Sequence, residues 1–225
     1  MIKRVLFSLI ESFIRNISGG IGQKIRYQYY KRRFKKCGFN VKIGIGVVLE
    51  GCDFIEVGNN VWIDDYCILI AGKTGDMKGR EVKILKNRDF KGEEGFIYIG
   101  SSIHFAQNCL IHGFGGVLIS DYVGLSTGVK IYSMSNHYQS FKNKSLITYS
   151  NPMVKKLPIV FIKSPIVIKE NVFVSINSII LFGTIGENSF IAPMSLVSKR
   201  IPKNSIAKGN PATVAKERFE TINET

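Results

Sequence analysis

Large apolar side chains recur every six residues over the C-terminal part of the chain. A helix repeats its apolar positions every 3.6 residues and a half-buried strand every two, so neither explains this period. A chain that turns a corner after each hexapeptide does, and hexapeptide repeats are typical of parallel β-helices, in which three faces close a coil of about eighteen residues. The positions are Ile168, Val174 and Ile180, followed one residue early by Ile185, Ile191 and Val197.

The same spacing extends upstream. Its positions are Phe39, Ile45, Gly51, Val57, Ile63 and Leu69, then Ile99, Phe105 and Ile111, then Ile119, Leu125 and Ile131. Each coil can bury its apolar row only by stacking on its neighbours, so the pattern predicts one elongated all-β solenoid domain over residues 39–215. Residues 72–96 and 138–165 lose the spacing and are predicted to be loops that leave the solenoid, and long loops on a regular scaffold are usually functional.

The N-terminal segment, residues 1–38, follows a helical pattern instead. Residues 2–17 are amphipathic, Ser18-Gly19-Gly20 is expected to end this helix, and a second helix is expected from Lys24 to Lys36. These helices either cap the open end of the solenoid or bind a membrane surface. A signal peptide is not expected, because Glu11 and Arg15 interrupt the apolar stretch and no small-residue cleavage site follows. Residues 216–225 are predicted to be a polar tail.

The net charge of +14 is concentrated at the N-terminus. Residues 1–36 hold ten Lys and Arg against a single acid, Glu11, which makes a local charge of +9. Such a surface favours anionic partners such as phosphate-bearing cofactors, anionic lipid or acidic glycans. Nucleic acid is not expected, because no finger, helix-turn-helix or RNA-recognition signature is present.

The four cysteines form no C-x-x-C pair. Cys67 and Cys109 each follow a turn aliphatic by four residues, where a small buried side chain is expected. A disulfide or zinc framework is therefore not predicted, and a reducing cytoplasm fits this usage.

Residues 170–216 resemble the hexapeptide-repeat acetyltransferases. The resemblance is carried by ENVFVSINSIILFGTIGENSFIAPMSLVSKRIPKNSIAKGNPATVAK, which ends in the family's Gly-Asn-Pro-Ala, and it continues upstream through ISDYVGLSTGVKIYSMSNHY (119–138). Within the family the chain looks most like the branch that O-acetylates sugars and surface polysaccharides, near the maltose, galactoside and nodulation-type enzymes. The resemblance implies a left-handed parallel β-helix, a homotrimer with active sites between subunits, and acetyl-CoA as the acetyl donor. The left hand rests on the resemblance alone, since parallel β-crossovers are normally right-handed.

Several positions depart from the family pattern. Phe173 stands where the family has Trp, Ser175 and Ser120 stand where it has Gly, and residues 182–184 are one shorter than its P-G-V-T. His137 lies six residues after Ile131, whereas the maltose-type pattern places its His about five after.

Transfer of an acetyl group from a thioester to a hydroxyl needs a base, and histidine, with an ordinary pKa of about 6.5, suits this role. His137, in Ser-Asn-His-Tyr, stands at the family's base position and is the predicted general base. His112, before Gly113, is the rival base or an acceptor-binding group, and His104 is expected to be structural. Asp121 is the nearest preceding acid to His137, although an acid at a turn is common for solvation alone.

The remaining candidates bind the acceptor, the oxyanion or the donor. Asn108 stands where sugar acetyltransferases have an acceptor-binding Asn, and Asn136 and Tyr138, which flank His137, are assigned to the acceptor as well. A backbone N–H of the turn at residues 126–128 or of Ser175 is expected to hold the oxyanion. The resemblance assigns Ala192, Ser198 and Lys199 to coenzyme A. Arg200 and Lys208 are expected to meet its phosphates together with Lys199, and Ser175 is also predicted to bind the cofactor.

The sequence thus predicts a cytoplasmic O-acetyltransferase that moves an acetyl group from acetyl-CoA to a sugar or polysaccharide precursor by direct attack in a ternary complex. One alternative is a non-catalytic solenoid that docks at the inner face of a membrane through residues 1–36. Another is a γ-type carbonic anhydrase, which needs three clustered histidine ligands. The histidine spacings of 8 and 25 contain no close pair, so no metal site is predicted.

Overall fold

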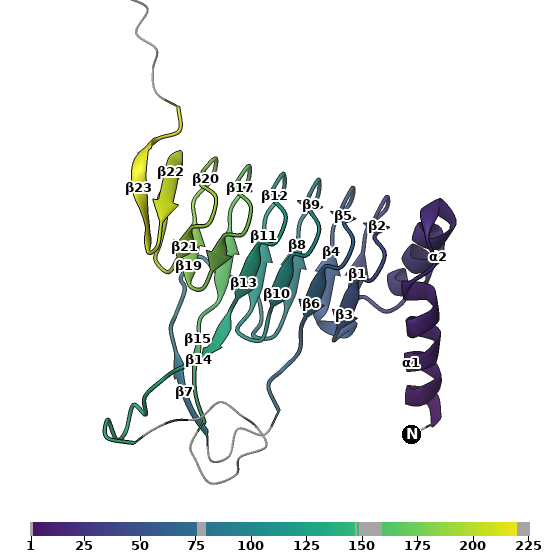
Figure 1. Cartoon of the computed structure of the whole chain (residues 1–225), viewed down its shortest axis with the longest axis horizontal. Coiled ribbons are helices and arrows are strands. Elements are labelled where there is room, and N and C mark those ends of the chain that lie inside the picture. Colours follow the sequence, from purple (N-terminus) through teal and green to yellow (C-terminus); the bar gives the residue numbers. More distant parts are fainter. Residues whose placement is uncertain (1, 76–79, 147, 149–158, 220–225) are drawn as a thin grey trace, which may run out of the picture.

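The computed structural model describes residues 2–75, 80–146, 148 and 159–219. Figure 1 shows a row of stacked coils, with two helices at one end and a β-hairpin at the other. Three sheets, here named A, B and C, form the faces of these coils, and their strands pair in parallel from coil to coil. This arrangement is that of a left-handed parallel β-helix, which confirms the predicted fold class.

The strands are short, and each coil contributes one to each face. Sheet A contains β1 (Lys36–Cys37), β4 (Ile55–Val57), β8 (Ile97–Ile99), β11 (Val117–Ile119), β16 (Ile166–Ile168) and β19 (Gly183–Ile185). Sheet B contains β2 (Lys42–Ile43), β5 (Trp62–Ile63), β9 (His104–Phe105), β12 (Gly124–Leu125), β17 (Phe173–Val174), β20 (Phe190–Ile191), β22 (Ser205–Gly209) and β23 (Ala212–Glu217), the last being antiparallel to β22. Sheet C contains β3 (Val48–Glu50), β6 (Ile68–Ile70), β10 (Leu110–His112), β13 (Lys130–Tyr132), β18 (Ile179–Ile180) and β21 (Leu196–Val197).

Inward-facing aliphatic residues at equivalent coil positions form the core. On sheet B, Ile63 pairs with Phe105 and Phe105 with Leu125, and all three side chains are buried. Coil length is not constant: the corner residues Asn40 and Asn60 are 20 apart, whereas Asn188 and Asn204 are 16 apart. The expected eighteen-residue coil therefore lies between the observed lengths.

The predicted phase of the first coil is wrong. Phe39 is 62% exposed, and Ile45 is only partly buried. Ile43 and Leu49 occupy the core positions instead, paired with Ile63 and Leu69 of the next coil. The physical reason is the 3-10 turn η1 (Cys52–Phe54), which lengthens the third corner and shifts the register before β4.

Asparagines hold one corner of the coils in the left-handed backbone region. Asn40, Asn60, Asn171, Asn188 and Asn204 have φ between 52° and 58°. Asparagine tolerates this region better than other residues with a side chain. Amide-to-amide hydrogen bonds link these side chains in places, from Asn40 to Asn60 at 2.9 Å and from Asn171 to Asn188 at 3.1 Å.

The helices differ in extent from the prediction. Helix α1 spans Ile2–Arg15 and helix α2 spans Gly19–Lys31, so the glycines begin the second helix, and Lys36 already belongs to β1. The α2 helix caps the first coil, because its Arg26 donates from Nε to the Ile43 carbonyl at 2.9 Å and Tyr30 is fully buried. Within the described chain, neither helix has the length and apolar content needed to cross a bilayer.

The two predicted loops meet in a small fourth sheet, D. It is built from β7 (Arg80–Ile84), β14 (Met134–Asn136) and β15 (Ile159–Lys163), with β15 parallel to β7 and antiparallel to β14. Figure 1 shows this sheet beside the solenoid, below the coils in that view. The buried Lys163 of β15 joins this sheet to the ends of the first excursion, residues 72–96, because its Nζ donates to Glu94 and Thr74, each at 2.6 Å.

Candidate functional site

A hollow of about 260 Å³ lies where the second excursion leaves sheet C. One side of it is lined by His112, which ends β10 and stacks against Tyr132 of the next coil with ring centroids 5.6 Å apart. The described residues that line it are His112, Tyr132, Met134, Ser135, Asn136 and Phe161. The hollow therefore combines one histidine with two aromatic walls and polar groups from β14.

Burial disfavours the charged form of the His112 imidazole. Burial lowers the pKa of this imidazole below its ordinary value of 6.5. Its Nδ1 is buried and has no hydrogen-bond partner among the described residues. Its carbonyl accepts bonds from the Ser133 N–H at 3.0 Å and the Ser133 hydroxyl at 2.8 Å, which fixes the backbone beneath the ring. A neutral, rigidly placed imidazole can accept a hydrogen bond or a proton from a bound ligand.

His137 lies one residue beyond β14 and outside the set that lines the hollow. Its Nδ1 is 2.7 Å from the Gln139 carbonyl oxygen, and the Gln139 N–H approaches the same nitrogen at 3.2 Å. The shorter contact makes Nδ1 the donor, a tautomer that leaves the lone pair on Nε2. The ring is also flanked by Tyr138 and Phe141, with centroids at 4.5 and 4.6 Å. A backbone carbonyl therefore orients this imidazole.

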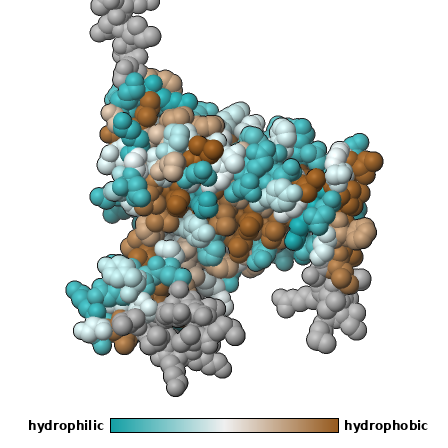
Figure 2. Space-filling view, in the orientation of Figure 1, coloured by the Kyte–Doolittle hydropathy of each residue, from teal (hydrophilic) through white to brown (hydrophobic). Residues whose placement is uncertain are grey.

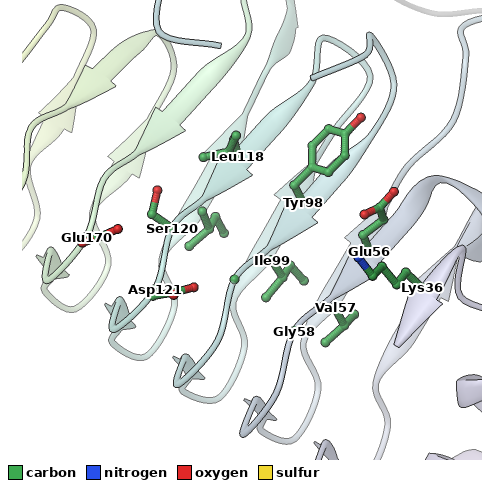
Figure 3. A pocket seen from close by; sticks show the side chains of 12 residues that line it. Lys36, Glu56, Val57, Gly58, Tyr98, Ile99, Leu118, Ser120, Asp121 and Glu170 are labelled. Atoms are coloured by element: carbon green, nitrogen blue, oxygen red, sulfur yellow. The ribbon is translucent and has the colours of Figure 1, made fainter. Parts of the chain in front are cut away.

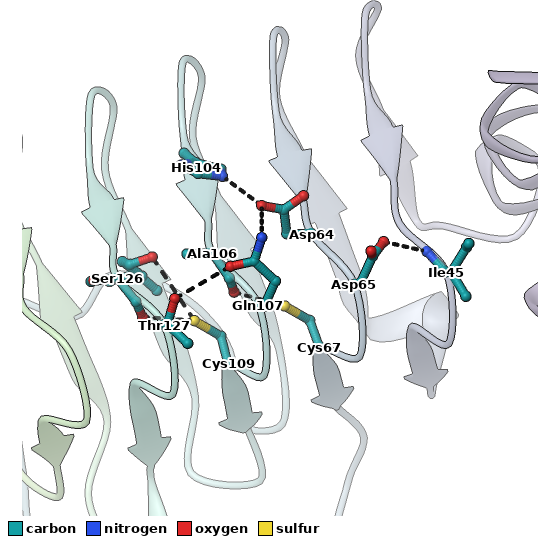
Figure 4. Close-up of polar contacts among 11 residues, drawn as sticks. Ile45, Asp64, Asp65, Cys67, His104, Ala106, Gln107, Cys109, Ser126 and Thr127 are labelled. Atoms are coloured by element: carbon teal, nitrogen blue, oxygen red, sulfur yellow. Dashed lines mark hydrogen bonds and ion pairs between the residues drawn. The ribbon is translucent and has the colours of Figure 1, made fainter. Parts of the chain in front are cut away.

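Asp121 stabilises a turn rather than orienting a histidine. Its Oδ1 accepts the Ser101 N–H at 2.7 Å and so joins two turns of adjacent coils. Asp65 makes the equivalent bond to the Ile45 N–H at 2.7 Å, which Figure 4 shows. The acid at this turn position stabilises the corner, as expected of a structural residue.

The predicted acceptor-binding residues are only partly brought together. Asn136 lines the hollow with His112. Tyr138 is 83% exposed and is not among the lining residues. Asn108 lies at a corner before β10, with φ of 60° and an exposed side chain, so its conformation alone accounts for an asparagine there.

The backbone groups expected to hold an oxyanion are already in use. The N–H groups of Ser126 and Ser175 donate to the Val174 and Ile191 carbonyls at 2.9 and 3.0 Å, as rungs of the coil ladder. The Gly128 N–H donates to the Gln107 carbonyl at 2.9 Å. The ladder would have to break to free any of these three donors, so they are less suited to hold an oxyanion, and that role stays a prediction for these groups.

The predicted donor-binding residues fall on two corners of the coils. Ser175, Ala192 and Lys208 occupy equivalent coil positions on sheet B, the first two just after β17 and β20 and the third within β22. Ser175 is buried and Lys208 is exposed. Ser198 follows sheet C, three rungs from His112 through Tyr132 and Leu181. Rungs are about 4.8 Å apart, so about 14 Å separates these two positions along one edge.

Basic residues extend that edge beyond Ser198. The side chain of Lys199 is exposed. Arg200 is less available, because its Nη1 pairs with Asp89 of the first excursion at 2.5 Å. The Thr184 hydroxyl, and then Arg200, lower the pKa of Asp89, so the carboxylate is charged at neutral pH. Lys199 is therefore the better placed of the two to meet a phosphate.

A larger hollow of about 360 Å³ lies on the outer face of sheet A (Figure 3). Tyr98 and Leu118 contribute to its walls. Three acids, Glu56, Asp121 and Glu170, line it against one lysine, Lys36. These acids would repel an anionic ligand here, whereas the edge beside His112 carries the exposed Lys199.

His104 has a partner that the sequence did not reveal. Its Nε2 is 3.1 Å from Asp64 Oδ2 on the preceding coil, and the same oxygen accepts a bond from Gln107 at 3.1 Å (Figure 4). The ring also lies beside Trp62, with centroids 5.2 Å apart. Strand pairing between neighbouring coils brings these residues together. The contact can be predicted only when the register of the coils is known. Among the described residues, no three His, Cys, Asp or Glu side chains gather closely enough to hold a metal ion.

Comparisons with known proteins agree with this architecture, although no family model matches the chain. The chain is 34% identical over 192 residues to the dTDP-4-amino-4,6-dideoxy-D-glucose acyltransferase of Escherichia coli, covering 85% of this chain and 86% of the relative. A variant of AntD, an N-acyltransferase from Bacillus cereus solved with dTDP and coenzyme A, superposes with a TM-score of 0.66 at 24% identity over 88% of this chain and 91% of its own. A maltose O-acetyltransferase from Clostridium difficile superposes with a TM-score of 0.54 at 22% identity over 97% and 88%. The length and identity of the match to the E. coli enzyme show that this chain belongs to the hexapeptide-repeat acyltransferase family.

Proposed function

We propose that this protein transfers an acyl group from an acyl-coenzyme A to a sugar carried by a nucleotide. The observation that carries the proposal is the 34% identity to the E. coli dTDP-4-amino-4,6-dideoxy-D-glucose acyltransferase over most of both chains. AntD, which shares the fold, has been solved with dTDP and 3-hydroxybutyryl-CoA. The donor is therefore an acetyl or short hydroxyacyl thioester, a class that cells hold in the cytoplasm.

The acceptor atom is the sugar's amine in the first version of this proposal. An amine is the acceptor implied by the name of the E. coli relative. A second version keeps the O-acetylation predicted from the sequence, with a sugar or polysaccharide-precursor hydroxyl as acceptor. It is favoured by His137, because a hydroxyl needs a base at neutral pH and the bond to Gln139 prepares Nε2 for that role.

In either version the proton follows one route. His137 Nε2 accepts the proton of the attacking amine or hydroxyl as the new C–N or C–O bond forms at the thioester carbonyl. The C–S bond then breaks, and the imidazolium returns its proton to the departing thiolate. His112 and Asn136 orient the sugar in the hollow, and the carrier lies along the sheet C edge towards Lys199. A homotrimer would complete the site with a neighbouring subunit, as the family resemblance implies.

A matched pair of acceptors tests the proposal. Purified protein is incubated with acetyl-CoA and either dTDP-4-amino-4,6-dideoxyglucose or the analogue with a hydroxyl at the same carbon, and thiol release is followed with a chromogenic disulfide. Release with the amine alone supports N-acylation, and release with the hydroxyl alone supports O-acetylation. If neither acceptor causes thiol release, with acetyl-CoA or with 3-hydroxybutyryl-CoA as donor, the nucleotide-sugar proposal is contradicted.

Three histidine variants then assign the base. His137→Gln is expected to lower kcat by about 10²–10⁴-fold, the usual contribution of a general base. His104→Gln is the matched control and keeps its activity, because its imidazole contacts Asp64 on a different face. Near-normal turnover in His137→Gln together with a large loss in His112→Gln would move the base to His112.

A further inference from the structure

Helix α1 is turned with its acid towards the protein and large apolar side chains towards solvent. Glu11 is mostly buried and its Oε1 pairs with Arg33 at 2.5 Å. Leu9 and Phe13, on the opposite side of the helix, are 64% and 80% exposed. A helix that served only as a cap would be expected to bury such side chains.

Helix α2 continues this pattern. Its inner side buries Gly22, Arg26 and Tyr30, whereas Ile21 is 73% exposed and Ile25 is 37% exposed on its outer side. The exposed apolar residues Leu9, Ile10, Phe13, Ile21 and Ile25 are named here the helical-end surface. Figure 2 shows apolar side chains mixed with hydrophilic ones at this end of the molecule.

Cations accompany the helical-end surface. Exposed side chains on and just after α2 include Lys24, Lys31, Arg32 and Lys35. The single acid of residues 1–36, Glu11, is already paired with Arg33. An apolar strip beside an excess of positive side chains is the combination that binds anionic lipid interfaces. A second copy of this chain would bring the same positive charge to the contact, which opposes self-association through this surface.

We propose that the helical-end surface docks this protein on an anionic lipid bilayer, with Leu9, Phe13 and Ile21 entering the headgroup region and the lysines meeting lipid phosphates. Basic amphipathic helices lie in the plane of the interface, so no membrane-crossing segment is needed. Docking would hold the enzyme at the membrane surface, and it is independent of which acceptor the site uses.

Vesicle co-sedimentation tests the proposal on the full-length protein. We expect sedimentation with vesicles of phosphatidylglycerol and phosphatidylcholine in about equal amounts, little with phosphatidylcholine alone, and a loss of binding as salt is raised. Phe13→Asp removes an exposed apolar group that would enter the headgroup region and adds a charge that anionic lipid repels, so it should weaken binding about tenfold or more. Phe219→Asp is the matched control, since Phe219 is 60% exposed beyond the β23 end, and it should bind as the native chain does.

Three results would overturn the proposal. The first is an absence of binding to the anionic vesicles, and the second is binding that Phe13→Asp leaves unchanged. The third is a native oligomer in lipid-free solution that Phe13→Asp dissociates, measured by light scattering, which would make a second copy the occupant. Thiol release with a soluble acceptor should be equal in both variants, so failure of the docking proposal and failure of the proposed acyl transfer are distinguishable.

Discussion

Replacing Ser133 with alanine tests the link between the solenoid and the candidate site. Ser133 is fully buried at the point where the second excursion leaves the coil. Its Oγ accepts the Gly115 N–H at 2.8 Å and donates to the His112 carbonyl at 2.8 Å. Its own carbonyl accepts the Ser164 N–H at 2.9 Å, where the excursion returns. One hydroxyl therefore joins the His112 side of the hollow to a neighbouring turn.

The cost of Ser133→Ala can be worked from these contacts. The buried Gly115 N–H loses its acceptor, which costs about 1–3 kcal/mol, whereas the His112 carbonyl keeps the Ser133 N–H and loses only about 0.5–1.5 kcal/mol. The expected loss is about 1.5–4.5 kcal/mol. In a protein of this size each kcal/mol of lost stability lowers Tm by about 2–4 °C, so Tm should fall by about 3–18 °C.

Thermal unfolding by calorimetry measures this change. Ser145→Ala is the control, because Ser145 is exposed and its recorded bond to Asn143 uses the backbone N–H, which alanine retains. A fall in Tm no larger for Ser133→Ala than for Ser145→Ala would refute the reasoning, since it would mean that the Gly115 N–H finds another acceptor at no cost.

Two further predictions concern named site residues. If the left-handed corner explains the asparagine, Asn108→Gly should keep both Tm and activity, and Asn108→Ala should be less stable by about 1 kcal/mol. Loss of activity in Asn108→Gly with an unchanged Tm would instead show that the amide binds the acceptor. Burial lowers the pKa of His112, so the unfolded chain binds this proton more readily than the folded chain. The stability contribution is complete above the unfolded pKa of about 6.5 and is lost as the pH falls from there through the lower pKa of the folded state. The drop in Tm between about pH 7.5 and 5.5 should therefore be smaller in His112→Gln, and an equal drop would contradict the assignment.

The solenoid was predictable because burial is repeated at every coil. Residues such as Ile111, Ile131 and Ile180 share one inward position, so a single period captures them all. The phase of the first coil could not be predicted in this way, because Phe39 and Ile43 are both apolar and a six-residue step can start from either of them. Only the extra turn at η1 decides between them, and a short 3-10 turn leaves little trace in the pattern of apolar residues.

Sheet D could not be predicted from the pattern of apolar residues. Strands β7 and β15 are separated by more than two whole coils, and each is stabilised by the other rather than by its own periodicity. The excursions 72–96 and 138–165 could therefore be recognised as departures from the solenoid but not as partners. Part of the prediction, residues 76–79, 147 and 149–158, lies outside the described residues.

Distance along a solenoid is set by coil position, and this decides which site assignments the sequence could make. His112 and Ser198 are far apart in the chain but only three rungs apart on one edge. Asn136 and His137 are neighbours in the chain, yet only Asn136 lines the hollow. Coil position also shows that the expected oxyanion donors Ser126 and Ser175 are ladder rungs, since the N–H of every residue at that position donates to the next coil. An oxyanion donor is consequently better sought among groups that the ladder leaves free, at the roots of the excursions, where the regular ladder is interrupted.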